Sequence, residues 1–83
     1  MQVQVRYFAL LREMLGTGET VELAPGQTLG QLRDLLLARG GRHAEALARG
    51  RALRCALNQT MCDESAELTE GAEVAFFPPV TGG

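Results

Sequence analysis

The chain has 83 residues, of which 46% are hydrophobic and 22% are charged, a composition typical of one small globular domain. Its formal net charge of −2 does not favour nucleic-acid binding, which usually requires a basic surface. No run approaches the roughly 18 apolar residues of a membrane span, and the first residues are strand-like rather than typical of a signal peptide. We therefore expect a cytoplasmic protein with no nucleic-acid or membrane partner.

The first quarter of the chain predicts two strands joined by a short helix. Residues 2–8 alternate between apolar and polar side chains, the pattern of a half-buried strand. Residues 9–15 carry leucine and methionine at helical spacing and end at Gly16, which favours a short helix. Residues 20–23 then predict a second strand, which returns as a hairpin.

The strongest helix signal follows. Thr28 and Gln31 have the spacing of a capping box, in which each residue's side chain bonds the other's backbone N–H. Leucines at helical spacing over residues 29–36 predict one main helix, which residues 40–41, both glycine, bring to an end. Residues 43–49 are expected to form a further helical turn or two.

The rest of the chain predicts strands. Residues 53–58 alternate again, with Cys55 on the inward face as a small packed hydrophobe. Residues 59–67 are either irregular or form a short edge strand. Residues 73–77 predict the last strand.

This order of elements describes an α+β fold of the ubiquitin-like β-grasp type. We expect a mixed sheet of four to five strands, one main crossing helix and short helical turns. The last strand would lie centrally beside the first and run parallel to it, which requires a long crossover connection. The predicted domain covers residues 1–77, and residues 78–83 form an extended tail.

Candidate catalytic and metal-binding groups are few. The two cysteines, Cys55 and Cys62, are seven positions apart, which matches no common zinc spacing. The single histidine, His43, is expected to be a surface residue rather than a general base. We therefore expect no metal site, no bound cofactor and no independent catalytic site.

Charges are unevenly distributed along the chain. Acidic residues gather before the tail and arginines gather in the middle, at positions 33, 39, 42, 49, 51 and 54. We expect both groups to be solvated surface; the alternative is that they steer docking to oppositely charged partners.

The end of the sequence is its most informative part. Glycine has no Cβ, so the final Gly82-Gly83 could enter a slot too narrow for any side chain. Pro78-Pro79 favours an extended conformation and reduces the entropy lost when a tail is threaded into a partner. A terminal carboxylate has a pKa near 3.5, so it is an anion at neutral pH and must be activated by another enzyme. Adenylation with ATP is the simplest route, and attack by sulfur would then give a thiocarboxylate.

The ending Phe76-Phe77-Pro78-Pro79-Val80-Thr81-Gly82-Gly83 resembles the MoaD-type sulfur carriers, the small subunits of molybdopterin synthase. The opening Val5-Arg6-Tyr7-Phe8-Ala9-Leu10-Leu11-Arg12-Glu13 resembles the same family's first strand and following helix, whereas residues 17–52 match only in pattern. The resemblance implies that an E1-like adenylyltransferase activates Gly83 and a sulfur donor protein converts it to a thiocarboxylate. The tail would then deliver sulfur to cyclic pyranopterin monophosphate in a large catalytic subunit, within a heterotetramer of two small and two large subunits.

A hydrophobic docking patch can also be placed. Phe8 falls on the polar face of the first strand, and Phe77 falls opposite Val74 and Phe76 on the last strand. Neighbouring strands would bring both aromatic side chains to one exposed face, with Met61 beside them. The resemblance assigns partner binding to the same three residues, and the tail residues predicted to bind the partner are Pro78, Pro79, Val80 and Thr81.

Three alternatives remain open. A ubiquitin-like protein modifier would use the diglycine to form isopeptide bonds, although a chain whose eight basic residues are all arginine cannot form lysine-linked polymers on itself. A thiazole-pathway sulfur carrier would share the chemistry but serve another acceptor. The last alternative is a passive β-grasp interaction domain.

Overall fold

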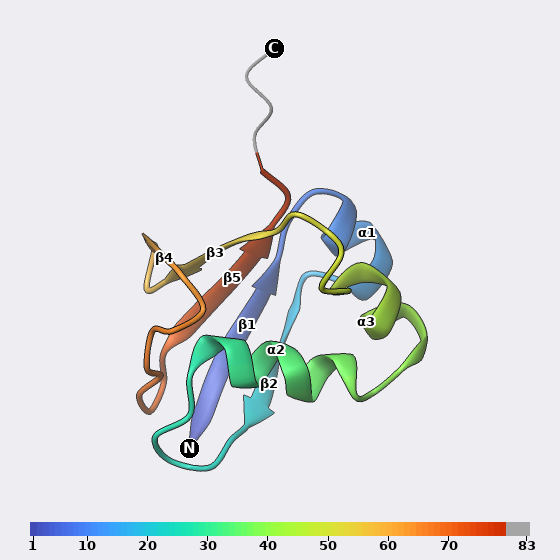
Figure 1. Ribbon diagram of the computed structural model, residues 1–83. Helices are drawn as coiled ribbons and strands as arrows, with labels where there is room; N and C mark the ends of the chain where they lie inside the picture. The colour runs from blue at the N-terminus through green and yellow to red at the C-terminus, as the bar shows by residue number, and fades with distance from the viewer. Residues whose placement is uncertain (80–83) are drawn as a thin grey trace.

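A five-stranded mixed sheet organises the protein, as the computed structural model of residues 1–79 shows (Figure 1). The elements in chain order are β1 (Gln2–Tyr7), α1 (Leu10–Leu15), β2 (Gly18–Glu22), α2 (Leu29–Leu37), α3 (Gly41–Ala46), β3 (Arg54–Leu57), β4 (Thr60–Cys62) and β5 (Glu73–Phe77).

The strand order is β2-β1-β5-β3-β4, so the last strand of the chain is the central strand of the sheet. The pair β1 and β5 is parallel, and the other three neighbouring pairs are antiparallel. This is the α+β, ubiquitin-like arrangement that the sequence predicts. Because β1 and β5 run in the same direction, both end at the same edge of the sheet, where the chain leaves β5 (Figure 1).

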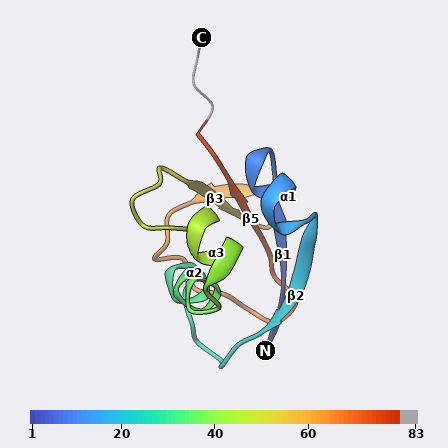
Figure 2. The same cartoon turned by 90° about the vertical axis from the view of Figure 1, so that its right-hand side faces the viewer.

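The helices α2 and α3 lie on one face of the sheet, and in residues 1–79 no helix covers the other face (Figure 2). The strand alternation matches this layering, because Val3, Val5 and Tyr7 of β1 are at most 1% exposed. Val74 and Phe76 of β5 meet them from the next strand. The core is therefore a single layer between the sheet and the helices, and the opposite face of the sheet is left open.

The predicted capping box is confirmed. Oγ1 of Thr28 accepts a hydrogen bond from the Gln31 N–H at 3.2 Å, and Oε1 of Gln31 accepts one from the Thr28 N–H at 2.8 Å. These two bonds satisfy backbone donors that the first turn of α2 leaves unpaired, and they fix where this helix begins.

Two strand boundaries differ from the prediction. The second strand begins at Gly18 rather than at residue 20, because Gly18 already pairs with Arg6 of β1. The two strands approach so closely there that a Cβ on residue 18 would lie 2.2 Å from the Val5 carbonyl oxygen. The third strand ends at Leu57 because Asn58 and Gln59, with φ of 49° and 69°, form the hairpin turn. Of the two possibilities for residues 59–67, β4 establishes the short edge strand.

Candidate functional site

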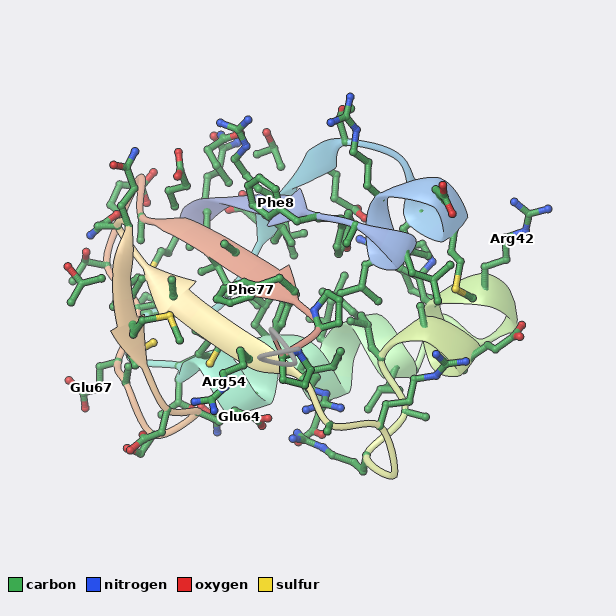
Figure 3. The ribbon with its side chains drawn as sticks, turned by 90° about the horizontal axis from the view of Figure 1, so that it is seen from above. Phe8, Arg42, Arg54, Glu64, Glu67 and Phe77 are labelled. Carbon is green, nitrogen blue, oxygen red and sulfur yellow. The ribbon has the colours of Figure 1, made fainter. Side chains whose placement is uncertain are left out.

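The open face of the sheet carries the candidate site. Register partners form a row across four strands, from Arg6 through Ala75 and Ala56 to Met61. In the next row, Phe77 of β5 lies opposite Arg54 of β3 (Figure 3). Residues opposite one another in a sheet share a face, so these side chains point away from the helices.

Phe8 joins Phe77 at the end of this face (Figure 3). Its predecessor Tyr7 is the register partner of Phe76, and the Phe8 N–H donates to the Phe76 carbonyl oxygen at 3.3 Å. Phe8 therefore occupies the position beside Phe77 on the neighbouring strand. The guanidinium carbon of Arg6 lies 5.9 Å from the centre of the Phe8 ring, within the range of a cation–π interaction.

The predicted triad of Phe8, Met61 and Phe77 therefore shares one face, and together with Ala56 and Ala75 we call it the open-face patch. Phe8 is 42% exposed and Met61 is 55% exposed, whereas Phe77 is half-buried. The short side chains of the two alanines leave this part of the sheet surface flat. Exposed apolar groups gathered in this way are typical of an interaction surface.

The tail begins beside this patch. Pro78 and Pro79 follow β5 directly and are half-buried. The remaining predicted site residues, Val80, Thr81, Gly82 and Gly83, lie outside the described residues. Pro79 lines a hollow of about 590 Å³ at this end of β3 and β4, together with Ala52, Leu53, Arg54, Cys55, Met61, Cys62, Asp63 and Glu64.

A buried arginine supports the wall of this hollow. Arg33 of α2 is 4% exposed, and its Nε and Nη2 donate to the Leu47 and Ala48 carbonyl oxygens at 2.8 and 2.7 Å. Its Nη1 donates to Oε2 of Glu64 at 2.7 Å. Arg49 also pairs with Glu64. The expectation that the central arginines are all solvated is therefore wrong for Arg33.

The pKa of Glu64 reflects these contacts. Burial raises this pKa, but the hydrogen bonds from Arg49 and Arg33 outweigh burial and hold it below its ordinary value. Glu64 therefore stays ionised at neutral pH, and it fixes the segment after β4 to α2. Because that segment follows β4, which carries Met61, the network holds the edge of the open-face patch in place.

A second polar cluster surrounds Glu19 of β2. Its Oε2 accepts a hydrogen bond from the Tyr7 hydroxyl at 3.0 Å and lies 3.2 Å from Nε2 of His43, while Arg39 donates to its Oε1 at 2.5 Å. Burial raises the pKa of Glu19, but the hydrogen bonds lower it by more, so the pKa lies below its ordinary value. His43 thus forms part of a contact between α3 and the sheet, with a side chain that is 24% exposed.

Within residues 1–79, no three or more histidine, cysteine or acidic side chains are placed to hold one metal ion together. No helix of the same residues has the length and apolarity needed to cross a bilayer. The exposed apolar side chains of the open-face patch lie next to the start of the tail, an arrangement that fits the binding of an apolar partner surface.

Comparisons with known proteins agree with this geometry. The ThiS family model matches residues 5–83. A molybdopterin synthase sulfur carrier subunit from Escherichia coli is 46% identical over 98% of this chain and 99% of its own length. Two solved structures are each 26% identical to this chain, and each alignment covers 100% of this chain and 100% of the other. SAMP1 from Haloferax volcanii has a TM-score of 0.78, and the complex of subunits 1 and 2 of molybdopterin-converting factor from Helicobacter pylori has a TM-score of 0.71.

Proposed function

Since the chain belongs to the ThiS family, we propose that it is the sulfur carrier subunit of molybdopterin synthase, as its relatives are named. It is then the small subunit of a sulfurtransferase complex that acts in molybdenum cofactor biosynthesis. In this proposal the large subunit supplies the catalytic site, and the small subunit supplies the sulfur.

The observation that carries the proposal is the position of the open-face patch. Phe77 is both a member of the patch and the last residue of the central strand, and the tail follows it directly. A partner that covers Phe8 and Phe77 would therefore also receive the start of the tail. Pro78 and Pro79 would guide the chain away from the sheet in an extended direction.

The proposed chemistry takes place at Gly83 and requires that this residue be C-terminal in the working protein. An E1-like adenylyltransferase joins the carboxylate to AMP from ATP and releases pyrophosphate. The terminal sulfur of a persulfide on a donor protein then attacks the carbonyl carbon, and AMP leaves. A donor thiol cleaves the S–S bond of this acyl disulfide, which frees the thiocarboxylate and leaves a disulfide on the donor. The resulting thiocarboxylate carries a soft, nucleophilic sulfur atom. Gly82 and Gly83 lack side chains, so this end can enter a narrow active site.

The acceptor in this proposal is cyclic pyranopterin monophosphate, held by the large subunit. The Helicobacter pylori structure is a complex of two subunits of molybdopterin-converting factor, and this supports a large-subunit partner. We propose a heterotetramer of two small and two large subunits. Two sulfur atoms are needed for each dithiolene, so the small subunit must leave, be recharged and return, and we place this cycle in the cytoplasm.

Two other uses of a diglycine end stay open as alternatives, a ubiquitin-like protein modifier and a thiazole-pathway sulfur carrier. Reconstitution separates them from the proposal. The thiocarboxylated chain, mixed with a large subunit and the pterin precursor, is expected to form the dithiolene product. No product with the large subunit, together with covalent attachment to protein lysines in an extract, would favour the modifier.

A further inference from the structure

Two thiols face each other across the edge of the sheet. Cys55 of β3 and Cys62 of β4 are direct register partners. Opposed residues of antiparallel strands have Cα atoms about 4.5–5.5 Å apart, within the range of about 4.4–6.8 Å that disulfides span. Sγ of Cys55 also donates to the Cys62 carbonyl oxygen at 3.3 Å. The two sulfur atoms can therefore be joined with little movement of the backbone.

The surroundings of the two thiols differ. Cys55 is 7% exposed and belongs to the core, whereas Cys62 is half-buried and packs against its edge. Both line the hollow beside Pro79. A small reagent that enters this hollow can reach Cys62 more readily than Cys55, because Cys62 is the more exposed of the two thiols.

We propose that Cys55 and Cys62 form a reversible dithiol–disulfide pair, a redox modification site that reacts with low-molecular-weight disulfides. The Cys62 thiol loses its proton, and its sulfur attacks the reagent's S–S bond, giving a mixed disulfide and one free thiol. Cys55 then attacks the Cys62 sulfur and releases the second thiol. The two protein thiols supply two electrons and two protons, and the reagent disulfide takes them up.

The order of attack follows from the thiols' environments. Burial raises the pKa of Cys55 to about 12, and the charge of a Cys62 thiolate adds to this effect. Since the thiolate is the reacting form, Cys62 attacks first.

The disulfide would restrain the short edge strand β4. The strand β4 has only three residues and lies at the edge of the sheet, and its central residue is Met61. A disulfide to β3 would hold this strand covalently beside the hollow. In reducing compartments such bonds are transient and regulatory rather than structural. The reaction of these two thiols does not depend on the proposed function.

Intact-mass analysis tests the pair directly. The reduced full-length chain is treated with hydroxyethyl disulfide, and an alkylating reagent then blocks the remaining free thiols. The intact mass of the product is measured by mass spectrometry. The expected product is a monomer with no alkyl groups and no adduct, which peptide mapping assigns to a Cys55–Cys62 bond and which dithiothreitol reverses. A stable hydroxyethyl adduct, two alkylated thiols at all reagent concentrations, or a disulfide-linked dimer would each overturn the proposal.

Single substitutions test the order of attack. In Cys55→Ala, the adduct on Cys62 is expected to persist, because no second thiol can displace it. In Cys62→Ala, Cys55 is expected to react at least tenfold more slowly than Cys62 does in the other variant. Equal rates at the two thiols would contradict the assignment of Cys62 as the attacking group.

Discussion

Arg33 and Glu64, which are 31 positions apart in the chain, are joined by a 2.7 Å hydrogen bond between Nη1 and Oε2. The arginine side chain is 5% exposed and the glutamate side chain 33% exposed, so the pair lies at the border of the core. The bond ties α2 to the segment that follows the edge strand β4. It links the main helix to the side of the sheet that carries Met61.

Removing this arginine should destabilise the fold. In Arg33→Ala, the carbonyl oxygens of Leu47 and Ala48 lose a buried donor and Glu64 keeps its pairing with Arg49, so we expect the free energy of unfolding to fall by about 1–3 kcal/mol. Urea denaturation measures the loss. The exposed Arg51→Ala is the control, and it should change the free energy by less than about 0.5 kcal/mol. Equal stabilities of the two variants would contradict the buried network.

The two adjacent phenylalanines of β5 should separate binding from stability. Phe77 lies on the open face, so Phe77→Ala is expected to raise the Kd for the large subunit about 30-fold, the effect of a 2 kcal/mol hot spot. Phe76 is 1% exposed, and Phe76→Ala should instead lower the free energy of unfolding by about 3–5 kcal/mol.

Titration calorimetry and thermal unfolding of both variants check this contrast. The open-face patch would be wrongly assigned if Phe77→Ala lost as much stability as Phe76→Ala and kept the wild-type affinity.

Acid should weaken the fold through Glu19. Its pKa in the folded protein is lowered from an ordinary value of 4.5, because hydrogen bonds from Arg39, His43 and Tyr7 outweigh the opposing effect of burial. A carboxyl group with a lowered pKa stabilises the fold above its unfolded pKa, and this contribution is lost as the pH falls through the folded pKa. The free energy of unfolding should therefore decline below about pH 4.5.

The variant Glu19→Gln isolates this contribution. It should be less stable than the wild type at neutral pH, and the difference should shrink steadily below pH 4.5 in denaturant titrations. A difference that stays constant down to the lowest pH would show that Glu19 acts through packing alone.

The close approach of β2 to β1 can be tested at one glycine. A Cβ at position 18 would lie 2.2 Å from the Val5 carbonyl oxygen, so Gly18→Ala should push the strands apart and lower the free energy of unfolding by about 1–3 kcal/mol. The matched control is Gly50→Ala, since a Cβ there meets nothing within 4 Å. Equal melting temperatures for the two variants would contradict the register of β1 and β2.

Local patterns in the sequence were sufficient to predict much of the fold. The alternation of Val3, Val5 and Tyr7 predicts which face of β1 is buried, and the spacing of Thr28 and Gln31 predicts where α2 begins. The same alternation at Phe8 and Phe77 predicts their common face. These features depend on neighbours within a few residues or on strand pairing alone.

The Arg33 network was missed because it depends on contacts distant in sequence. Arg33 lies four positions after Leu29 and one after Leu32, so it falls on the buried stripe of α2, a signal that helical spacing does contain. We expected Arg33 to be exposed because charged side chains are mostly found at the surface. Only the fold reveals the carbonyl oxygens of Leu47 and Ala48 and the carboxylate that pair with it.

The mass of the carrier after activation shows directly whether Gly83 takes up sulfur. The chain is incubated with an E1-like enzyme, ATP and a sulfur donor protein, and its intact mass is measured by mass spectrometry. A variant that lacks Gly83 is treated and measured in the same way. We expect one oxygen of the Gly83 carboxyl group to be replaced by sulfur in the full chain and the shortened variant to stay unchanged. A full chain that gains no sulfur, or a shortened chain that gains the same mass, would contradict this expectation.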